Sequence, residues 1–167
     1  TRKESSAASD VYKRQTIDNM VKYINDIAGI RIICSFTSDI YRIADMIRDQ
    51  RDIKVIAVKD YITYPKASGY KSYHMIVSIP VYLSDRTVDT KVEVQIRTVA
   101  MDFWASLEHK IHYKFEGDAP ENIKNELVEC ARMVSDLDAR MLSLNEEILA
   151  ISKKREEEKQ LNSGTSK

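Results

Sequence analysis

The sequence has no excess of either charge, almost no cysteine and no long apolar run. Over 167 residues, 26 Lys and Arg residues balance 26 Asp and Glu residues. Bulk charge therefore marks neither nucleic acid nor a membrane surface as a partner, and any anion-binding site must be a local cluster. No stretch approaches the ~18 apolar residues of a membrane span, and no signal peptide is visible. We expect a cytoplasmic protein with no membrane partner.

The two cysteines, Cys34 and Cys130, lie far apart in the sequence among residues typical of a core. In a reducing cytoplasm they remain thiols, which argues against a disulfide and against a cysteine metal site. A content of 43% hydrophobic and 31% charged residues is typical of one globular domain with a substantial core.

The first 15 residues stand apart from the rest of the chain. They have no apolar periodicity, and "DVYKRQ" (10–15) resembles the translated end of a transposon adapter used in sequencing libraries. We expect residues 1–15 to be a disordered assembly artefact fused to a truncated gene. A disordered natural terminus is the alternative, and in either case the segment is left out of the fold prediction.

Segments rich in β-branched residues predict strands at residues 27–36, 53–62, 71–83 and 91–98. Residues 63–70 contain Pro and Gly and predict a loop, whereas 84–89 predict a short connection between two strands. Strands separated by helices, with one tight connection, predict an α/β (α+β) layer with a mixed sheet.

Helices are expected between and after these strands. Residues 16–26 have the pattern of the end of one helix, Ser38 and Asp39 can cap a second, and Thr98 can cap a third. The expected apolar faces are Ile40, Ile43, Ala44 and Ile47 in the second helix, and Val99, Phe103, Leu107 and Ile111 in the third.

The last third of the chain carries a heptad pattern, which is typical of a long helix that packs against another helix. The apolar positions are Ile123, Leu127, Cys130, Val134, Leu137, Met141, Leu144, Ile148 and Ile151. Such a helix could cover the domain's own sheet, but about four heptads exceed that need. We therefore favour an oligomer interface for residues 119–153. Residues 154–167 lose the pattern and are expected to be disordered.

The strand "KVEVQIRT" (91–98) places apolar residues on one face and Glu93, Gln95 and Arg97 on the other. Taken alone, this polar face could be a solvated side of an antiparallel sheet. Two charged residues change this interpretation. Asp26 directly precedes the apolar run 27–36, and Arg31 is the charge within it. Together with the polar face, they favour a binding site.

The segment 59–74 adds cations and aromatic rings close to the same sheet, namely Lys59, Lys66, Tyr70, Lys71 and His74. Carboxylates can hold Mg²⁺ together with phosphate oxygens, cations neutralise phosphates, and a Tyr ring can stack on a nucleobase. The residues alone therefore predict Mg²⁺-dependent nucleotide chemistry.

Three stretches together resemble the synthetase domain of RelA/SpoT homologues, and most of all the small alarmone synthetases. They are "DIAGIRI" (26–32), "KDYITYPKASGYKSYH" (59–74) and "VEVQIRTVAMDFWASLEHKIHYK" (92–114), and the resemblance covers about residues 16–150. It implies a nucleotidyltransferase-like mixed sheet flanked by helices, with a synthetase domain at 16–118 that lacks its N-terminal part. It also implies transfer of pyrophosphate from ATP to the ribose 3′-hydroxyl of GDP or GTP, which makes (p)ppGpp in the stringent response. Related small synthetases form tetramers, so a homotetramer is expected.

The resemblance gives each matching residue a role. Asp26 would bind Mg²⁺, while Glu93 would assist the metal and act as the base for the attacking hydroxyl. Arg31 would contact ATP, and Tyr70 would stack on guanine. The remaining GDP/GTP-binding residues would be Lys59, Lys66, Ser68, His74, Gln95, Arg97 and Asp102. For Gln95 and Arg97, direct contact and a supporting role remain open.

Two departures from the family pattern bear on activity. The basic helix that precedes the aspartate motif and grips ATP is absent, so we expect this chain to make little or no alarmone. Asp102 stands where some relatives have Asn facing guanine, and its carboxylate could accept from guanine N1–H and the N2 amine. An inactive nucleotide-binding oligomer and a regulator that binds single-stranded RNA are the alternative functions.

Overall fold

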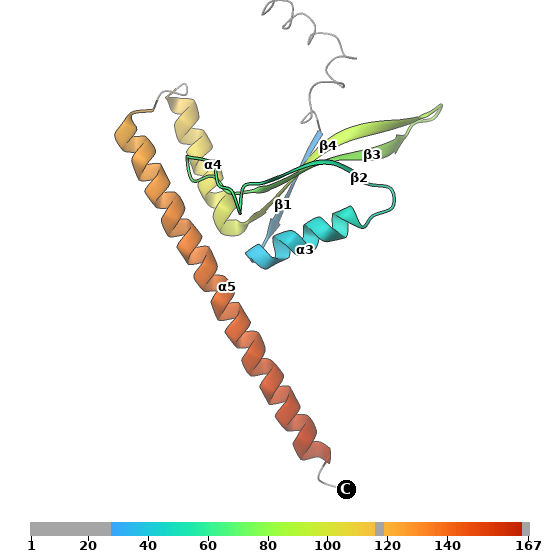
Figure 1. Ribbon diagram of the computed structural model, residues 1–167, viewed down its shortest axis with the longest axis vertical. Helices are drawn as coiled ribbons and strands as arrows, with labels where there is room; N and C mark the ends of the chain where they lie inside the picture. Colours follow the sequence, from blue (N-terminus) through green and yellow to red (C-terminus); the bar gives the residue numbers. More distant parts are fainter. Residues whose placement is uncertain (1–27, 116–118, 165–167) are drawn as a thin grey trace, which may run out of the picture.

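The computed structural model describes residues 28–115 and 119–164 (Figure 1). Its elements are β1 (Ala28–Cys34), α3 (Thr37–Arg48), β2 (Lys54–Asp60), β3 (Tyr73–Tyr82), β4 (Thr87–Thr98), α4 (Val99–Lys114) and α5 (Glu121–Gly164). The expected α+β class with a long C-terminal helix is confirmed. Asp26 and the helix end expected at 16–26 lie outside the described residues.

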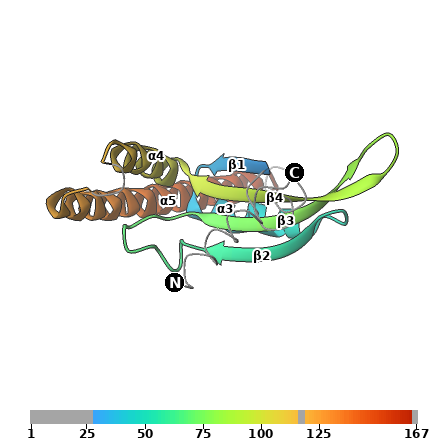
Figure 2. The same ribbon diagram turned by 90° about the horizontal axis from the view of Figure 1, so that it is seen from above.

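The strands form one mixed sheet in the order β1-β4-β3-β2. β1 runs parallel to β4, and the other two pairs are antiparallel, as Figure 2 shows from above. The hairpin between β3 and β4 is closed by a hydrogen bond of 2.8 Å from Leu83 N–H to Arg86 O. The tight connection is therefore shorter than expected, and β4 begins at Thr87 rather than near residue 91.

Helix α3 covers the apolar face of the sheet. Ile40 and Ala44 are 0% and 1% exposed, and they pack in one cluster with Met75 and Ile96 of the sheet. The predicted apolar face of this helix is confirmed. The predicted caps are wrong, because Phe36 occupies the N-cap position in extended conformation without a side-chain cap.

Thr98 caps α4 as predicted, since Met101 N–H donates to Thr98 Oγ1 at 3.2 Å. The predicted buried face of α4 is wrong. Val99, Phe103 and Leu107 are 64%, 60% and 43% exposed. The buried positions are instead Met101, Trp104 and Ala105, which face the sheet and α5. The small Ala105 allows close helix approach, whereas the prediction followed the large apolar residues.

Helix α5 lies beside α4 at one end of the sheet and then extends away from the body (Figures 1 and 2). The first part packs on α4, where Trp104 Nε1 donates to Leu127 O at 3.0 Å. The second part exposes the rest of the heptad seam: Leu137, Met141, Leu144, Ile148 and Ile151 are each 49–61% exposed. Within the described ranges no helix has the length and apolar content to cross a membrane.

The expected disorder of residues 154–167 is wrong for residues 154–164, because α5 continues to Gly164. This part of the helix is rich in Lys, Glu and Arg, which are strong helix formers. Lys153 Nζ also lies 4.0 Å from Glu157 Oε1, one helical turn away. Loss of the apolar seam removes packing but leaves helix propensity intact.

Candidate functional site

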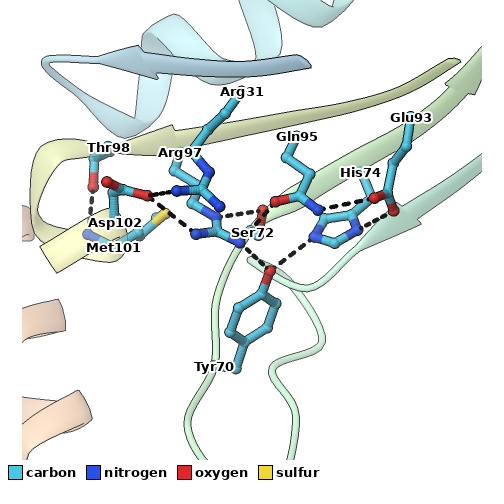
Figure 3. Close-up of polar contacts among 10 residues, drawn as sticks. All are labelled: Arg31, Tyr70, Ser72, His74, Glu93, Gln95, Arg97, Thr98, Met101 and Asp102. Atoms are coloured by element: carbon cyan, nitrogen blue, oxygen red, sulfur yellow. Dashed lines mark hydrogen bonds and ion pairs between the residues drawn. The ribbon is translucent and has the colours of Figure 1, made fainter. Parts of the chain in front are cut away.

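One row of polar residues crosses all four strands on the face opposite α3. Arg31 of β1 pairs with Gln95 of β4, Gln95 pairs with His74 of β3, and His74 pairs with Lys59 of β2. Partners in adjacent strands point to the same side of a sheet, so these side chains share one face. The sheet therefore brings together residues that are far apart in the sequence. In Figure 3, Gln95 and His74 both contact Glu93, whereas Arg31 extends toward Asp102.

Five side chains close a ring of hydrogen bonds around this row (Figure 3). Arg97 Nη2 donates to Tyr70 Oη at 2.5 Å and to Gln95 Oε1 at 2.9 Å. Tyr70 Oη lies 2.9 Å from His74 Nε2, and His74 Nδ1 lies 3.0 Å from Glu93 Oε1. Gln95 Nε2 closes the ring by donating to Glu93 Oε2 at 2.9 Å. All contacts are satisfied if the tyrosine hydroxyl donates to Nε2 and Nδ1–H donates to the carboxylate.

The protonation states of His74 and Glu93 follow from this environment. Burial is the largest influence on His74 and lowers its pKa, although the hydrogen bond with Glu93 acts in the opposite direction. Burial alone would raise the pKa of Glu93, but hydrogen bonds from Gln95 and His74 outweigh it and lower the pKa. At neutral pH the pair is thus a neutral imidazole that donates to an ionised carboxylate, not an ion pair.

The lowered pKa of His74 predicts a loss of stability in mild acid. Below an ordinary pKa of 6.5, the unfolded chain takes up a proton that the folded His74 binds less readily, so the free energy of unfolding falls as pH decreases. Urea unfolding of the wild type and of His74→Gln at pH 7.5 and 5.5 checks this. The wild type should lose more stability between the two pH values, and equal losses would assign the effect to other groups.

Arg97 is the hub of the cluster and is only 5% exposed. Besides the ring contacts, its Nε donates to Ser72 Oγ at 3.2 Å and its Nη1 donates to Asp102 Oδ1 at 3.1 Å. The same carboxylate oxygen lies 3.3 Å from Nη1 of Arg31, whose side chain is 52% exposed. Asp102 therefore joins one buried and one accessible guanidinium.

The loop at residues 61–72, between β2 and β3, carries Tyr70 into the cluster. Asp60 fixes the start of this loop, because its Oδ1 accepts from the backbone N–H groups of Ile62 and Thr63 at 2.9 and 3.0 Å. These contacts form a turn that projects the loop beyond the sheet.

The far end of the loop turns at Gly69, whose φ of +86° is in the region that favours glycine. Lys66 then lies over two rings, with Nζ 4.9 Å from the Tyr70 centroid and 5.0 Å from the Tyr61 centroid. A flat ligand ring that stacks on Tyr70 must share this ring with, or displace, the lysine ammonium.

A cavity of about 600 Å³ lies between the polar face, the loop and α4. This volume is in the usual range for a small-molecule site. Six of the predicted site residues line this cavity: Arg31, Lys66, Ser68, Tyr70, Gln95 and Arg97.

Helix α4 adds residues to this cavity that the sequence analysis assigned no role. They are Ala105, Ser106, Glu108, His109 and Lys110. Ser106, His109 and Lys110 follow helical spacing of three and four residues, so a polar face of α4 was the available signal.

A magnesium site fits the chemistry of Glu93, which offers an ionised carboxylate beside the cavity lining. Mg²⁺ commonly takes one or two protein carboxylates and completes its shell with phosphates and water. No group of three or more His, Cys, Asp and Glu residues suited to a metal occurs within residues 28–115 and 119–164. Asp26, the other expected ligand, lies outside these ranges.

Comparisons with known proteins agree with this geometry. The family model described as "Region found in RelA / SpoT proteins" matches residues 2–118. The GTP pyrophosphokinase YwaC of Bacillus subtilis is 49% identical over 133 residues, which are 80% of this chain and 63% of that protein. The GTP pyrophosphokinase YjbM of the same organism is 39% identical over 77% of this chain and 61% of that protein. This chain thus spans about three fifths of the length of these relatives.

Solved structures give the same result. The small alarmone synthetase 2 of Bacillus subtilis superimposes with a TM-score of 0.76 at 45% identity, covering 88% of this chain and 77% of that one. The small alarmone synthetase 1 of Bacillus subtilis, bound to its product pppGpp, gives a TM-score of 0.77 at 36% identity, covering 86% and 75%. The family match, the sequence identities and the superpositions agree: the chain belongs to the RelA/SpoT family.

Proposed function

We propose that this chain is a (p)ppGpp synthetase that transfers pyrophosphate from ATP to the ribose 3′-hydroxyl of GDP or GTP. The observation that carries the proposal is the ionised Glu93 carboxylate, which Gln95 and His74 hold in place next to a cation-lined cavity. Relatives named GTP pyrophosphokinase and a similar structure bound to pppGpp support it.

In the proposed reaction, the 3′-oxygen attacks the β-phosphorus of ATP and AMP leaves. Glu93 accepts the proton of the 3′-hydroxyl as the new bond forms. The neutral His74 donates to Glu93 and keeps one carboxylate oxygen oriented. Because the pKa of Glu93 is lowered, the group is ready as a base at neutral pH but is a weak one, so its accurate placement matters.

Cations divide between the two nucleotides in this proposal. Lys66 and Lys110 of the cavity lining and Lys59, which pairs with His74, neutralise acceptor phosphates, whereas the half-exposed Arg31 contacts ATP. His109 can donate a hydrogen bond to the same phosphates. Arg97 donates four hydrogen bonds within the protein, one of them to Gln95. This favours a role for Arg97 and Gln95 in holding other site residues in place over direct contact with the nucleotide. Ser68 lines the cavity, and Asp102, which contacts the lining residues Arg31 and Arg97, accepts from guanine.

Mg²⁺ is the proposed cofactor, and Glu93 and Asp26 would hold it. When bound, it neutralises charge on the ATP phosphates in the transition state. The protein side chains orient the hydroxyl and take its proton.

Replacing Tyr70 with Ala tests the acceptor half of the site. Loss of base stacking should weaken GDP binding by about 1–3 kcal/mol, whereas affinity for a non-hydrolysable ATP analogue should remain within about twofold. Isothermal titration measures both. Tyr70→Phe keeps the ring but removes the hydroxyl that bridges Arg97 and His74, so it separates stacking from the hydrogen-bond ring.

The matched control is Tyr64→Ala, because Tyr64 is on the same loop and 77% exposed. It should leave both affinities unchanged. Equal losses of GDP and ATP-analogue affinity in Tyr70→Ala would indicate a collapsed loop rather than a stacking site.

Incubation with labelled ATP, GDP and Mg²⁺ tests the reaction itself. Formation of ppGpp and AMP in equal amounts is expected, at a low rate for residues 16–167 alone and at a higher rate when the upstream basic helix of a relative is added. Absence of product from both proteins would overturn the proposal. Filter binding with single-stranded RNA tests the alternative function, and a cytoplasmic location remains a prediction.

We further propose that the chain assembles as a homotetramer through the exposed part of α5. The apolar side chains of its heptad seam, 49–61% exposed, form a surface that a second copy with the same seam would cover.

A further inference from the structure

A buried carboxylate of α5 is bonded to the junction between β4 and α4. Asp138 is 8% exposed, and its Oδ2 accepts a hydrogen bond of 2.8 Å from Thr98 Oγ1. Thr98 is fully buried, and its Oγ1 also accepts from Met101 N–H at 3.2 Å. Burying a carboxylate costs free energy, and an apolar side chain at this position would fill the space without that cost.

The junction that Asp138 holds lies between two site residues. Arg97 directly precedes Thr98, and Asp102 lies in the first turn of α4. Their side chains are joined by the 3.1 Å contact that Figure 3 shows beside Thr98. The relative position of the strand end and the helix start therefore sets the geometry between Arg97 and Asp102.

The same face of α5 also supports the Tyr70 loop. A Cβ added at Gly69 would lie 2.4 Å from the Cβ of Ala131, so the loop backbone rests directly on the helix. Ala131 and Asp138 are separated by seven residues, which is about two helical turns and places them on one face. The contact region around Gly69, Ala131 and Asp138 is tightly packed, with a cavity of only about 10 Å³.

We propose that Asp138 is a positioning residue for the acceptor side of the site, acting through Thr98. Its carboxylate fixes the Thr98 hydroxyl, the hydroxyl fixes the first turn of α4, and this turn places Asp102 against Arg97. Because α5 supports the Tyr70 loop on the same face, one helix sets the spacing between the two parts of the acceptor cavity. The nucleotide readouts of this proposal rest on the proposed function.

The test compares Asp138→Ala with Asp138→Asn in the full chain. Loss of the acceptor in Asp138→Ala should raise KM for GDP roughly tenfold, because Asp102 is then no longer held in place for its charge-assisted hydrogen bond with guanine. KM for ATP should stay within about twofold. The amide oxygen of Asp138→Asn can still accept from Thr98, so this variant should restore most of the GDP affinity.

Two further variants complete the set. Thr98→Val removes the partner hydroxyl, and its combination with Asp138→Ala should add little to the effect of Thr98→Val alone. Asp136→Ala is the matched control, because Asp136 lies two residues away on the same helix and is exposed. It should leave both KM values unchanged.

Hydrogen exchange gives a readout that needs no nucleotide. Protection of the Met101 amide should fall in Asp138→Ala and remain in Asp138→Asn and Asp136→Ala. The single tryptophan, Trp104, reports through its fluorescence whether α4 still packs on α5.

Three outcomes would overturn the proposal. One is unchanged Met101 exchange in Asp138→Ala, and another is an unchanged KM for GDP. The third is an equal rise in KM for GDP and for ATP together with altered Trp104 fluorescence, which would leave Asp138 a structural role only. If neither this chain nor its form extended by the upstream basic helix makes ppGpp, the proposed function fails, and the Met101 exchange then decides the role of Asp138 by itself.

Discussion

In the form extended by the upstream basic helix, Glu93→Gln is expected to reduce the rate of ppGpp synthesis by about 10²–10⁴-fold while GDP affinity stays within about threefold. The substitution removes the proton acceptor and one negative charge but keeps the shape of the side chain. Since the loss affects the transition state, it should appear in kcat and not in nucleotide binding.

The hydrogen-bond ring explains why binding should survive. In the wild type, the carboxylate accepts from His74 Nδ1–H and from Gln95 Nε2–H. In Glu93→Gln, the new amide oxygen can accept from Gln95 while its NH₂ group donates to His74. The imidazole then changes tautomer and donates from Nε2 to the Tyr70 hydroxyl oxygen, which still accepts from Arg97 and turns its own proton toward the cavity that Tyr70 lines. The ring therefore has an alternative proton arrangement without moving a heavy atom.

The measurement is initial-rate kinetics with ATP and GDP, together with titration of GDP binding. Glu126→Gln is the matched control, because it makes the same chemical change at an exposed position of α5. Comparable turnover by Glu93→Gln and the wild type would remove Glu93 from the reaction. A loss of GDP binding instead would show that the alternative proton arrangement does not form.

The sheet and its polar face could be predicted because both depend on local alternation. The strand 91–98 alternates strictly, so Glu93 and Gln95 had to share a face. The residues also placed Arg31 and His74 close to this sheet before any family resemblance was used, and the strand pairing brings all four to adjacent positions.

Helix α4 shows where the sequence misleads. Its large apolar residues, such as Phe103, define an apolar face that remains exposed, whereas Trp104 and the small Ala105 are buried. The orientation is fixed by the Thr98 junction and by α5, which starts more than 20 residues later. A local pattern cannot contain that constraint.

The role of Asp138 has no local signal either. It is one of several acidic residues along α5, and only its contact with Thr98, 40 residues earlier, distinguishes it from the exposed Asp136. Arg97 is similar, since alternation placed it on the polar face but only the fold reveals its four partners. Supporting residues depend on long-range packing, and single sequences record that poorly.

Leu144→Asp together with Ile151→Asp is expected to convert the assembled protein into a monomer. Leu144 and Ile151 are 52% and 51% exposed on the seam of α5, one heptad apart. In an assembly through this seam both side chains would be buried, and each unpaired carboxylate there would cost several kcal/mol. Both substitutions are remote from the Thr98 junction, because Asp138 precedes Leu144 by more than one helical turn.

The matched control adds the same charge on the opposite side of the helix, as Ala139→Asp with Ala150→Asp. Both positions are exposed, and neither belongs to the heptad seam. Sedimentation velocity over a range of concentrations should give a tetramer for the wild type and the control, and a monomer for the seam variant. The unfolding midpoint should depend on protein concentration only in the assembling proteins, because association stabilises the folded state by mass action. A monomeric wild type would rule out assembly through α5, and a seam variant that still assembles would place the interface on another surface.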